Sequence, residues 1–192
     1  DEMFHLLRLH GMTMSTAQRH GARTVAFESY DRFGYNYRMT DIQAAIGREQ
    51  LKRLPEIVRL RRGLAERYFS LLGGIPGLGL PEEPPWARSN WQSFCVRLPD
   101  RFDQREVMQR MLDQGVATRR GVMCSHRERV YASEPWACGA GPGPCGCAPA
   151  TCKRLVESEK AQDHCIVLPL FAQMTEAQQD RVVEVLKAAV SA

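Results

Sequence analysis

The feature that most constrains this chain is a short polar and aromatic cluster that leads directly into a helix start. The cluster runs from Tyr35 to Arg38 and offers two phenols, an amide and a guanidinium. Thr40 and Gln43 then have the spacing of a capping box, in which each side chain bonds the backbone N–H of the other residue. The pattern predicts a helix from Asp41, whose N–H groups and dipole favour an anion such as phosphate. It equally fits an ordinary capped surface helix that follows a loop.

Composition narrows the class of protein. The chain has 192 residues, of which 44% are hydrophobic, so it can fill a core. Its 22 Arg and four Lys are mixed with acidic residues, which argues against a nucleic-acid groove. No apolar run approaches the roughly 18 residues of a membrane span, and the N-terminus lacks the arrangement of a signal peptide. We therefore predict a soluble, cytoplasmic protein with no nucleic-acid or membrane partner.

Hydrophobic periodicity predicts three helices in the first part of the chain. The first covers Met3 to His10 and stops at Gly11, and the second covers Asp41 to Leu54. Pro55 is expected to separate it from a third helix that ends at Leu72, because proline breaks the hydrogen-bond ladder and fits a first turn. The arginines of this third helix are interpreted as a solvated face.

The later part of the chain has the pattern of a small α+β unit. We expect strands over 90–98, 116–118 and 165–168, a helix capped by Asp103 that ends near Gln114, and a last helix that starts at a second capping box, Thr175 to Gln178. The Gly- and Pro-rich stretch 73–85 reads as a linker. The predicted domains are therefore 1–72 and 86–192.

A loop at 137–152 concentrates thiols, at Cys138, Cys145, Cys147 and Cys152. Four cysteines suit tetrahedral zinc, and a metal would order a loop that has no core of its own. A disulfide within the loop and plain free cysteines in a variable insertion are the alternatives that the spacing leaves open.

The run from Gly34 to Gly47, together with the REQLKRLPEIVRLRRGLAERY that follows, resembles the DegT and StrS type of sugar aminotransferases. These are pyridoxal-phosphate enzymes of the aspartate-aminotransferase fold. MFHLLRLHGM and VLPLFAQMTEAQQDRVVEVL are similar to further segments of the same family, so the resemblance covers nearly all of the chain except the cysteine loop.

The resemblance implies site residues at matching positions. Asn36 matches an asparagine that reaches the cofactor phosphate of the partner subunit, and Tyr37 and Arg38 match neighbouring positions at that interface. TRRGVMCSH is similar to a segment that approaches the sugar substrate, which makes Arg119, Arg120, His126 and Tyr131 substrate-side candidates. No catalytic residue is assigned, because none of Lys52, Lys153, Lys160 and Lys187 matches the Schiff-base lysine.

The resemblance also implies a fold and an activity. The expected fold class is α/β, the C-terminal portion of a fold type I pyridoxal-phosphate-dependent transferase: residues 1–72 end the large cofactor-binding domain and supply the connecting helix, and 86–192 form the small domain. The complete protein is expected to be a homodimer that moves an amino group from an amino-acid donor, glutamate, to a keto-sugar nucleotide. This chain alone, as a C-terminal half, would be inactive. The alternative is a non-catalytic binding or regulatory protein on the same scaffold, with a zinc-stabilised cysteine loop as its contact surface.

Overall fold

The computed structural model describes residues 2–12, 30, 32–121, 123–128 and 151–191. Its contacts divide the chain into two compact units, Asp1–Leu54 and Pro55–Ala192. This division lies upstream of the predicted linker at 73–85. Leu78 and Leu80 from that stretch pack against the core of the second unit, and Gly79 forms a bridge with Arg97.

The first unit contains α1 (Glu2–Arg8) and the first part of α3 (Asp41–Leu72). Helix α1 confirms the predicted first helix. Leu9 then forms an antiparallel bridge with Asn36, and Met12 forms one with Tyr30. Large apolar side chains of this unit are exposed, among them Phe4, Phe33, Ile42 and Ile46.

The prediction of a helix break at Pro55 was wrong, because α3 continues through this residue for 32 residues. Proline removes one N–H and crowds the carbonyl four residues earlier, a local cost. The helix tolerates that cost because its second half is fixed by tertiary packing, with Ala65, Tyr68 and Leu72 buried in the core of the second unit.

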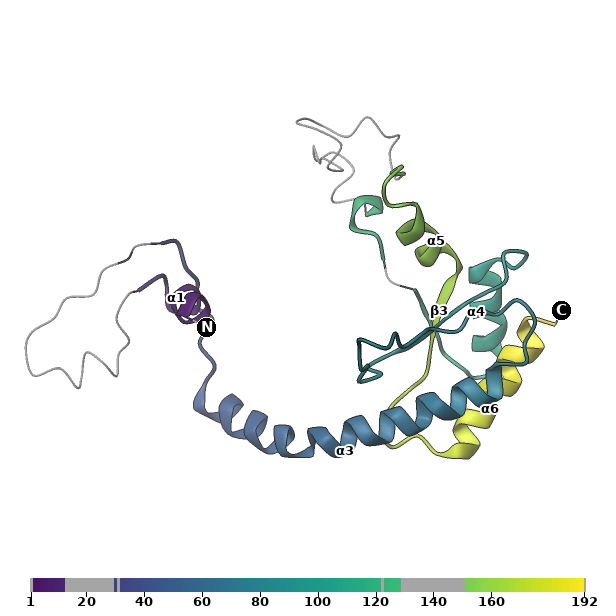
Figure 1. Ribbon diagram of the computed structural model, residues 1–192, viewed down its shortest axis with the longest axis horizontal. Coiled ribbons are helices and arrows are strands. Elements are labelled where there is room, and N and C mark those ends of the chain that lie inside the picture. Colours follow the sequence, from purple (N-terminus) through teal and green to yellow (C-terminus); the bar gives the residue numbers. More distant parts are fainter. Residues whose placement is uncertain (1, 13–29, 31, 122, 129–150, 192) are drawn as a thin grey trace, which may run out of the picture. The chain divides into compact units, whose positions relative to one another are not determined.

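The second unit is built on an antiparallel three-stranded sheet with the order β1-β3-β2, whose central strand β3 is labelled in Figure 1. Its strands are β1 (Phe94–Arg97), β2 (Arg119–Arg120) and β3 (Cys165–Leu168). The strand predicted at 116–118 is therefore displaced to the two arginines that follow it. Strand β3 confirms the prediction for 165–168, and β1 lies within the predicted 90–98.

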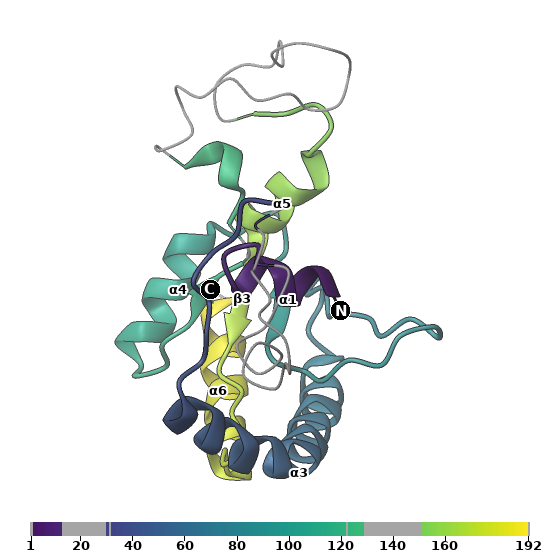
Figure 2. The ribbon, with the colours of Figure 1, turned by 90° about the vertical axis from the view of Figure 1, so that its left-hand side faces the viewer.

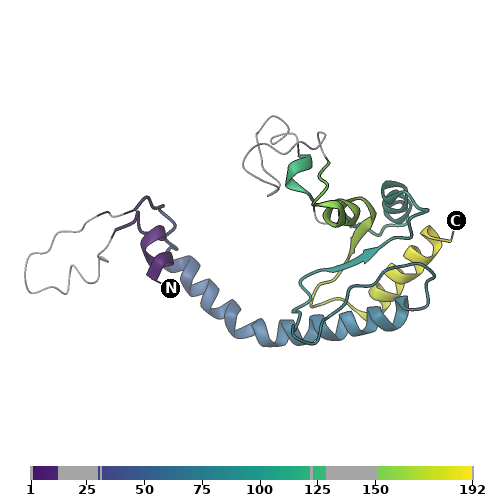
Figure 3. The same ribbon diagram turned by 45° about the horizontal axis from the view of Figure 1, so that its top comes forward.

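Helices cover the apolar face of this sheet. Phe94, Val96, Ile166 and Leu168 alternate inward and pack with α3, α4 (Gln104–Asp113) and α6 (Glu176–Ala189). Figures 1 and 3 show α6 beside the C-terminal half of α3, where Gln179 Nε2 donates to the Leu64 carbonyl at 2.7 Å. Both predicted caps are confirmed, since Asp103 accepts from Glu106 N and Thr175 forms a capping box with Gln178.

One helix, α5 (Val156–His164), was not predicted. It follows the 3-10 turn η1 (Ser125–Arg127) in the described chain and continues directly into β3 (Figure 2). Its only buried residue is Gln162, so it lacks the apolar stripe by which sequence patterns reveal a helix. Among the described residues, no helix is both long and apolar enough to cross a membrane.

Candidate functional site

In the first unit, backbone hydrogen bonds fasten the polar cluster to the end of α1. Tyr35 N donates to Leu7 O at 2.6 Å, and Tyr37 N donates to Arg8 O at 3.1 Å. Tyr35 O accepts from His10 N at 3.0 Å. These bonds fix the backbone on both sides of Asn36, so the position of its side chain is set by α1.

This arrangement requires glycine at two positions. Gly11 has a φ of +75°, and a Cβ there would lie 1.9 Å from the Arg32 carbonyl oxygen. A Cβ on Gly34 would lie 2.1 Å from the backbone nitrogen of Gly11. The two segments therefore approach more closely than any side chain permits.

The side chains of the cluster form one exposed group of hydrogen-bond donors. Arg38 Nε donates to Asn36 Oδ1 at 3.0 Å, which turns the asparagine's NH₂ group away from Arg38. The rings of Tyr35 and Tyr37 stack with centroids 5.0 Å apart. An amide NH₂, a guanidinium and two phenols suit an anion such as a phosphate.

The predicted capping box at Thr40 is confirmed. Gln43 N donates to Thr40 Oγ1 at 3.3 Å, and Thr40 N donates to Gln43 Oε1 at 2.9 Å. Both backbone N–H groups are thus already paired. An anion bound beside this helix start would therefore depend on the side chains of Asn36, Tyr37 and Arg38 together with the other N–H groups of the first turn.

In the second unit, a cleft of about 930 Å³ opens beside β2 and β3. Arg119 and Arg120, both predicted as substrate-side residues, line it, and Arg61 contributes a third guanidinium. Among the described residues that line the cleft, none is acidic. The others are Gln92, Ser93, Ala117, Thr118, Gly121, Met123, Val167, Leu168, Pro169 and Leu170.

Arg61 was missed as a site residue, because the arginine run was interpreted as a solvated face. Its Nη1 donates to the carbonyls of Trp91 at 3.0 Å and Gln92 at 2.7 Å, which ties α3 to the chain that enters β1. Helical spacing places Arg61 in line with Leu64 and Tyr68, on the face that packs inward. This spacing is the feature of the sequence that could have identified Arg61 as an inward-facing residue.

The structure does not bring His126 to the cleft lining. Its side chain is only 6% exposed, and Nε2 lies 2.7 Å from Glu159 Oε1. Glu159 also accepts from Cys152 N at 2.6 Å and lies 3.5 Å from Arg127. The hydrogen bond from His126 lowers the pKa of Glu159. The contact between His126 and Glu159 thus connects the 3-10 turn η1 to helix α5.

The remaining candidates fall largely outside the described residues, which exclude Tyr131, Cys138, Cys145 and Cys147. Cys152 is described and is 2% exposed. Within the described ranges, no group of three or more His, Cys, Asp or Glu side chains is placed to hold a metal ion. The structure therefore gives the zinc prediction no support.

Next to the cleft, the thiols of Cys95 and Cys165 are neighbours on β1 and β3, and Cys95 pairs with the cleft residue Val167. Burial, followed by the effect of Cys165, raises the pKa of Cys95 from 9.0 to about 11. Folding therefore favours the neutral thiol, and this contribution to stability is full below pH 9.0 and is lost as the pH rises toward 11.

We expect Cys95 to react slowly with iodoacetamide. Because its pKa is about 11 and not 9.0, its thiolate fraction at neutral pH is about 100-fold below that of an ordinary thiol. Peptide-resolved mass spectrometry of the native protein should show a rate that is still rising between pH 9 and pH 11. A rate that levels off by about pH 10, as expected in the urea-unfolded control, would contradict the raised pKa.

Comparisons with known proteins agree with this architecture. The sequence profile of the DegT/DnrJ/EryC1/StrS aminotransferase family matches residues 1–187. The erythromycin biosynthesis sensory transduction protein EryC1 of Saccharopolyspora erythraea is 31% identical over 157 residues, which are 81% of this chain and 38% of EryC1. The chain thus spans about two fifths of the length of that relative.

Solved structures show the same fold. The aminotransferase TlmJ from Streptoalloteichus hindustanus matches with a TM-score of 0.71 and 27% identity, over 99% of this chain and 44% of TlmJ. The sugar aminotransferase CalS13 from Micromonospora echinospora matches with a TM-score of 0.66 and 25% identity, over 97% of this chain and 44% of CalS13. These matches confirm the expected fold class, a C-terminal portion of the sugar aminotransferase fold.

Proposed function

This chain belongs to the DegT/DnrJ/EryC1/StrS aminotransferase family, and from that premise we propose that the complete protein transfers an amino group from glutamate to a keto-sugar nucleotide. The observation that carries the proposal is the family match over residues 1–187. Pyridoxal phosphate is the cofactor expected of this family. The chain contributes a cofactor-side cluster and a substrate-side cleft to the whole.

The cofactor-side residues fit a phosphate. Asn36 would donate through its amide NH₂, Tyr37 through its phenol and Arg38 through its guanidinium. When bound, pyridoxal phosphate supplies the electron sink for amino-group chemistry. Because none of Lys52, Lys153, Lys160 and Lys187 matches the Schiff-base position of the family, we propose that this lysine lies in another part of the complete enzyme.

The substrate-side role falls to the cleft of the second unit. Arg119 and Arg120 would hold the anionic part of a substrate, with Arg120 oriented by Glu128 at 2.8 Å. The proposed roles of His126 and Tyr131 stay predictions. Through Glu159, His126 would act by positioning the chain that carries the two arginines.

Exposed apolar side chains support a larger assembly. In the first unit, Phe33 is fully exposed, Phe4 is 75% exposed and Ile42 is 74% exposed. Large exposed apolar side chains are candidates for interface residues in soluble proteins. We propose that it is covered by the remainder of the enzyme and by the second subunit of a homodimer.

Replacing Asn36 with alanine in the complete enzyme should weaken pyridoxal-phosphate binding by about tenfold, because a hydrogen bond to a charged phosphate is lost. Equilibrium dialysis followed by absorbance of the bound cofactor measures this change. Gln50→Ala, which removes an exposed amide from α3, is the matched control and should bind normally. Equal cofactor affinity of the Asn36→Ala variant and the wild type would refute the phosphate role.

The description of EryC1 as a sensory transduction protein favours a second candidate, a binding or regulatory protein on the same scaffold. A transamination assay on the complete protein, with glutamate and a keto-sugar nucleotide, separates the two. Release of 2-oxoglutarate supports the enzyme. Cofactor and nucleotide binding without amino transfer supports the regulator.

A further inference from the structure

We propose that the thiols of Cys95 and Cys165 form a binding site for one soft metal ion that takes two ligands, Cu(I). The two cysteines lie on β1 and β3, and neither is among the described residues that line the substrate-side cleft. The site also uses none of the cysteines of the loop at 137–152, for which zinc was predicted. It is therefore separate from the sites of the proposed function.

The strand register brings the two cysteines together on one face of the sheet. Cys95 pairs with Val167 and Arg97 pairs with Cys165, so the cysteines are diagonal neighbours on adjacent strands. Successive side chains of a strand point to opposite faces, and the strand residues that alternate with the cysteines face the core. Cys95 and Cys165 therefore lie on the other face, where both are half-buried free thiols.

The two thiols contact each other through a hydrogen bond. Burial, followed by the charge of Cys165 and this bond, raises the pKa of Cys95 to about 11. Burial also raises the pKa of Cys165, but there the hydrogen bond and the charge of Arg97 oppose the rise. Cys95 is thus the donor and Cys165 the acceptor, so Cys165 more readily becomes a thiolate. Cys165 would bind the ion first, and the ion would then displace the proton of Cys95.

The diagonal position suits a bridging ion better than a disulfide. Diagonal residues of an antiparallel pair have Cα atoms about 7–8 Å apart, and beyond roughly 7 Å a disulfide requires backbone movement. Strand β3 is central and is bonded to β1 on one side and β2 on the other, which resists such movement. A metal ion between the sulfurs, with two bonds of roughly 2.3 Å as in zinc thiolates, spans a wider gap than an S–S bond of about 2.05 Å.

A pair of thiols suits Cu(I) and not zinc. Within the described ranges, no third His, Cys, Asp or Glu is placed to share a metal ion with this pair. Structural zinc takes four protein ligands, and catalytic zinc takes three with a water. Thiolates are soft ligands that select Cu(I), and this ion is stable between two sulfurs alone.

Binding is balanced in atoms and charge. Cu(I) forms two bonds to sulfur, two S–H bonds break and both protons go to solvent, with no electron transfer and no oxidant. The product carries one negative charge. Arg97 lies opposite Cys165 in the register, and its positive charge already acts on that sulfur. Asp100 binds the same guanidinium at 2.8 Å and offsets part of its charge, so Arg97 favours the complex moderately.

Protection from alkylation tests the site on the full 192-residue chain. Trypsin places the two cysteines on separate peptides, 89–97 and 161–181, each with a single cysteine. The reduced protein is exposed to Cu(I), buffered with a chelator under ascorbate, and then to iodoacetamide at about pH 9, where thiols react measurably. Copper should slow the alkylation of both cysteines together by about tenfold or more, because a metal-bound sulfur is no longer a free nucleophile.

Single substitutions show whether the two thiols act as a pair. Cys165→Ser should abolish the protection of Cys95, and Cys95→Ser that of Cys165, because serine keeps the size of the side chain without a soft ligand. Cys165→Ala should give the same result, and circular dichroism checks that each variant is folded. Cys124→Ser is the matched control, because it removes one thiol outside the sheet, and it should leave both cysteines protected.

A variant with serine at Cys138, Cys145 and Cys147 tests whether the loop holds the ion instead. It should keep the protection of Cys95 and Cys165, and one equivalent of zinc in this variant should protect neither. The site is overturned if copper leaves the alkylation of Cys95 unchanged, if Cys95 stays protected in Cys165→Ser, or if protection is lost with the loop thiols. Equal protection by zinc overturns the two-coordinate assignment. Because no step needs cofactor or turnover, these outcomes are independent of the transamination assay.

Discussion

Replacing Phe94 with alanine is expected to lower the free energy of unfolding by about 3–5 kcal/mol, the usual cost of deleting a buried aromatic ring. Phe94 is 0% exposed and stands at the centre of the aromatic group in the core. Its ring centroid lies 5.0 Å from that of Tyr68, 5.2 Å from that of Phe69 and 5.6 Å from that of Trp91. Because β1 and α3 meet through these rings, the cavity would weaken their contact directly.

Urea unfolding of the full chain, followed by far-ultraviolet circular dichroism, measures this loss. Phe171→Ala is the matched control, since it deletes the same ring at a residue that is 40% exposed, and it should cost about 1 kcal/mol or less. Similar losses in the two variants would show that the core is not organised around Phe94. If the m-value is unchanged, the lower free energy of unfolding reflects a less stable native state.

The elements that the sequence predicted well are those whose signal is local. Both capping boxes hold, because Thr40 with Gln43 and Thr175 with Gln178 satisfy each other within one helical turn. The amphipathic helices α4 and α6 were found because their apolar faces repeat at the helical period. The polar cluster of Asn36, Tyr37 and Arg38 was visible because its residues are consecutive, whereas its role toward a cofactor came from the family resemblance and stays a prediction.

What the sequence could not predict depends on tertiary contacts. Helix α5 has no apolar stripe and is held by polar bonds instead, including one from Cys124 N to the Gln162 side chain. The continuity of α3 through Pro55 likewise follows from packing. The cleft is assembled from residues as distant as Arg61 and Arg119, so its charge was visible only after folding.

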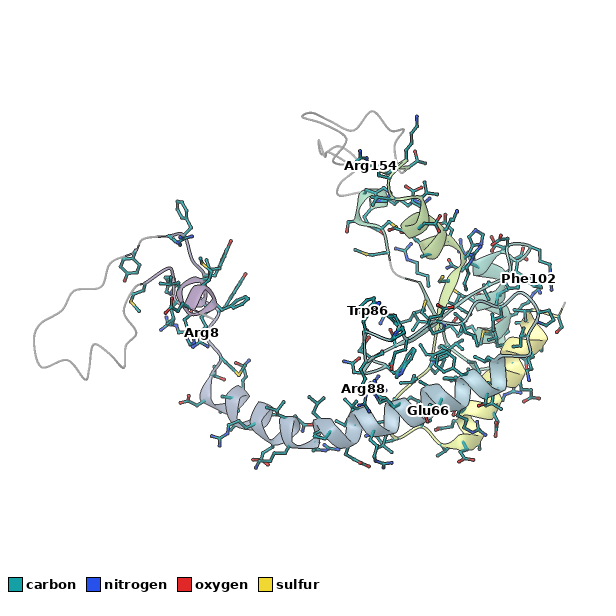
Figure 4. All side chains as sticks on the ribbon, in the orientation of Figure 1. Arg8, Glu66, Trp86, Arg88, Phe102 and Arg154 are labelled. Atoms are coloured by element: carbon teal, nitrogen blue, oxygen red, sulfur yellow. The ribbon has the colours of Figure 1, made fainter. Side chains whose placement is uncertain are left out.

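The exposed loop between α3 and β1 also carries side chains that no periodicity explains. Figure 4 shows Trp86 and Arg88 projecting from this loop, and Trp86 is 86% exposed. The Pro-rich sequence around them disfavours helix, which accounts for the extended backbone. Nothing in the described structure accounts for an exposed tryptophan there.

The second large effect is expected from Gly121→Ala, which should destabilise the chain by about 2–3 kcal/mol. A Cβ at this position would lie 2.7 Å from the Ala161 carbonyl oxygen and 2.9 Å from the Cys165 carbonyl oxygen. Both are backbone atoms, so no side chain can rotate to make room. Gly121 N also donates to Cys165 O at 2.6 Å, a bond that would have to lengthen.

Gly63→Ala provides a control of opposite sign. A Cβ on Gly63 meets nothing within 4 Å, and the residue lies inside α3, so alanine should stabilise the chain by about 0.5–1 kcal/mol. Thermal unfolding of the two variants therefore separates a steric effect from a general effect of removing glycine. Destabilisation by both, or by neither, would contradict the packing at Gly121.

Gly121→Ala should also affect the cleft, because Gly121 follows the two arginines on β2 and its contacts hold β2 against β3. Arg119 pairs with Val167 and Arg120 with Ile166, so a displaced Gly121 would move both guanidinium groups. In the complete enzyme, we expect affinity for the proposed keto-sugar nucleotide to fall by about tenfold at temperatures where the variant remains folded. Gly63→Ala should bind normally. If Gly121→Ala lowered stability but left this affinity intact, the strand pairing would not be what positions Arg119.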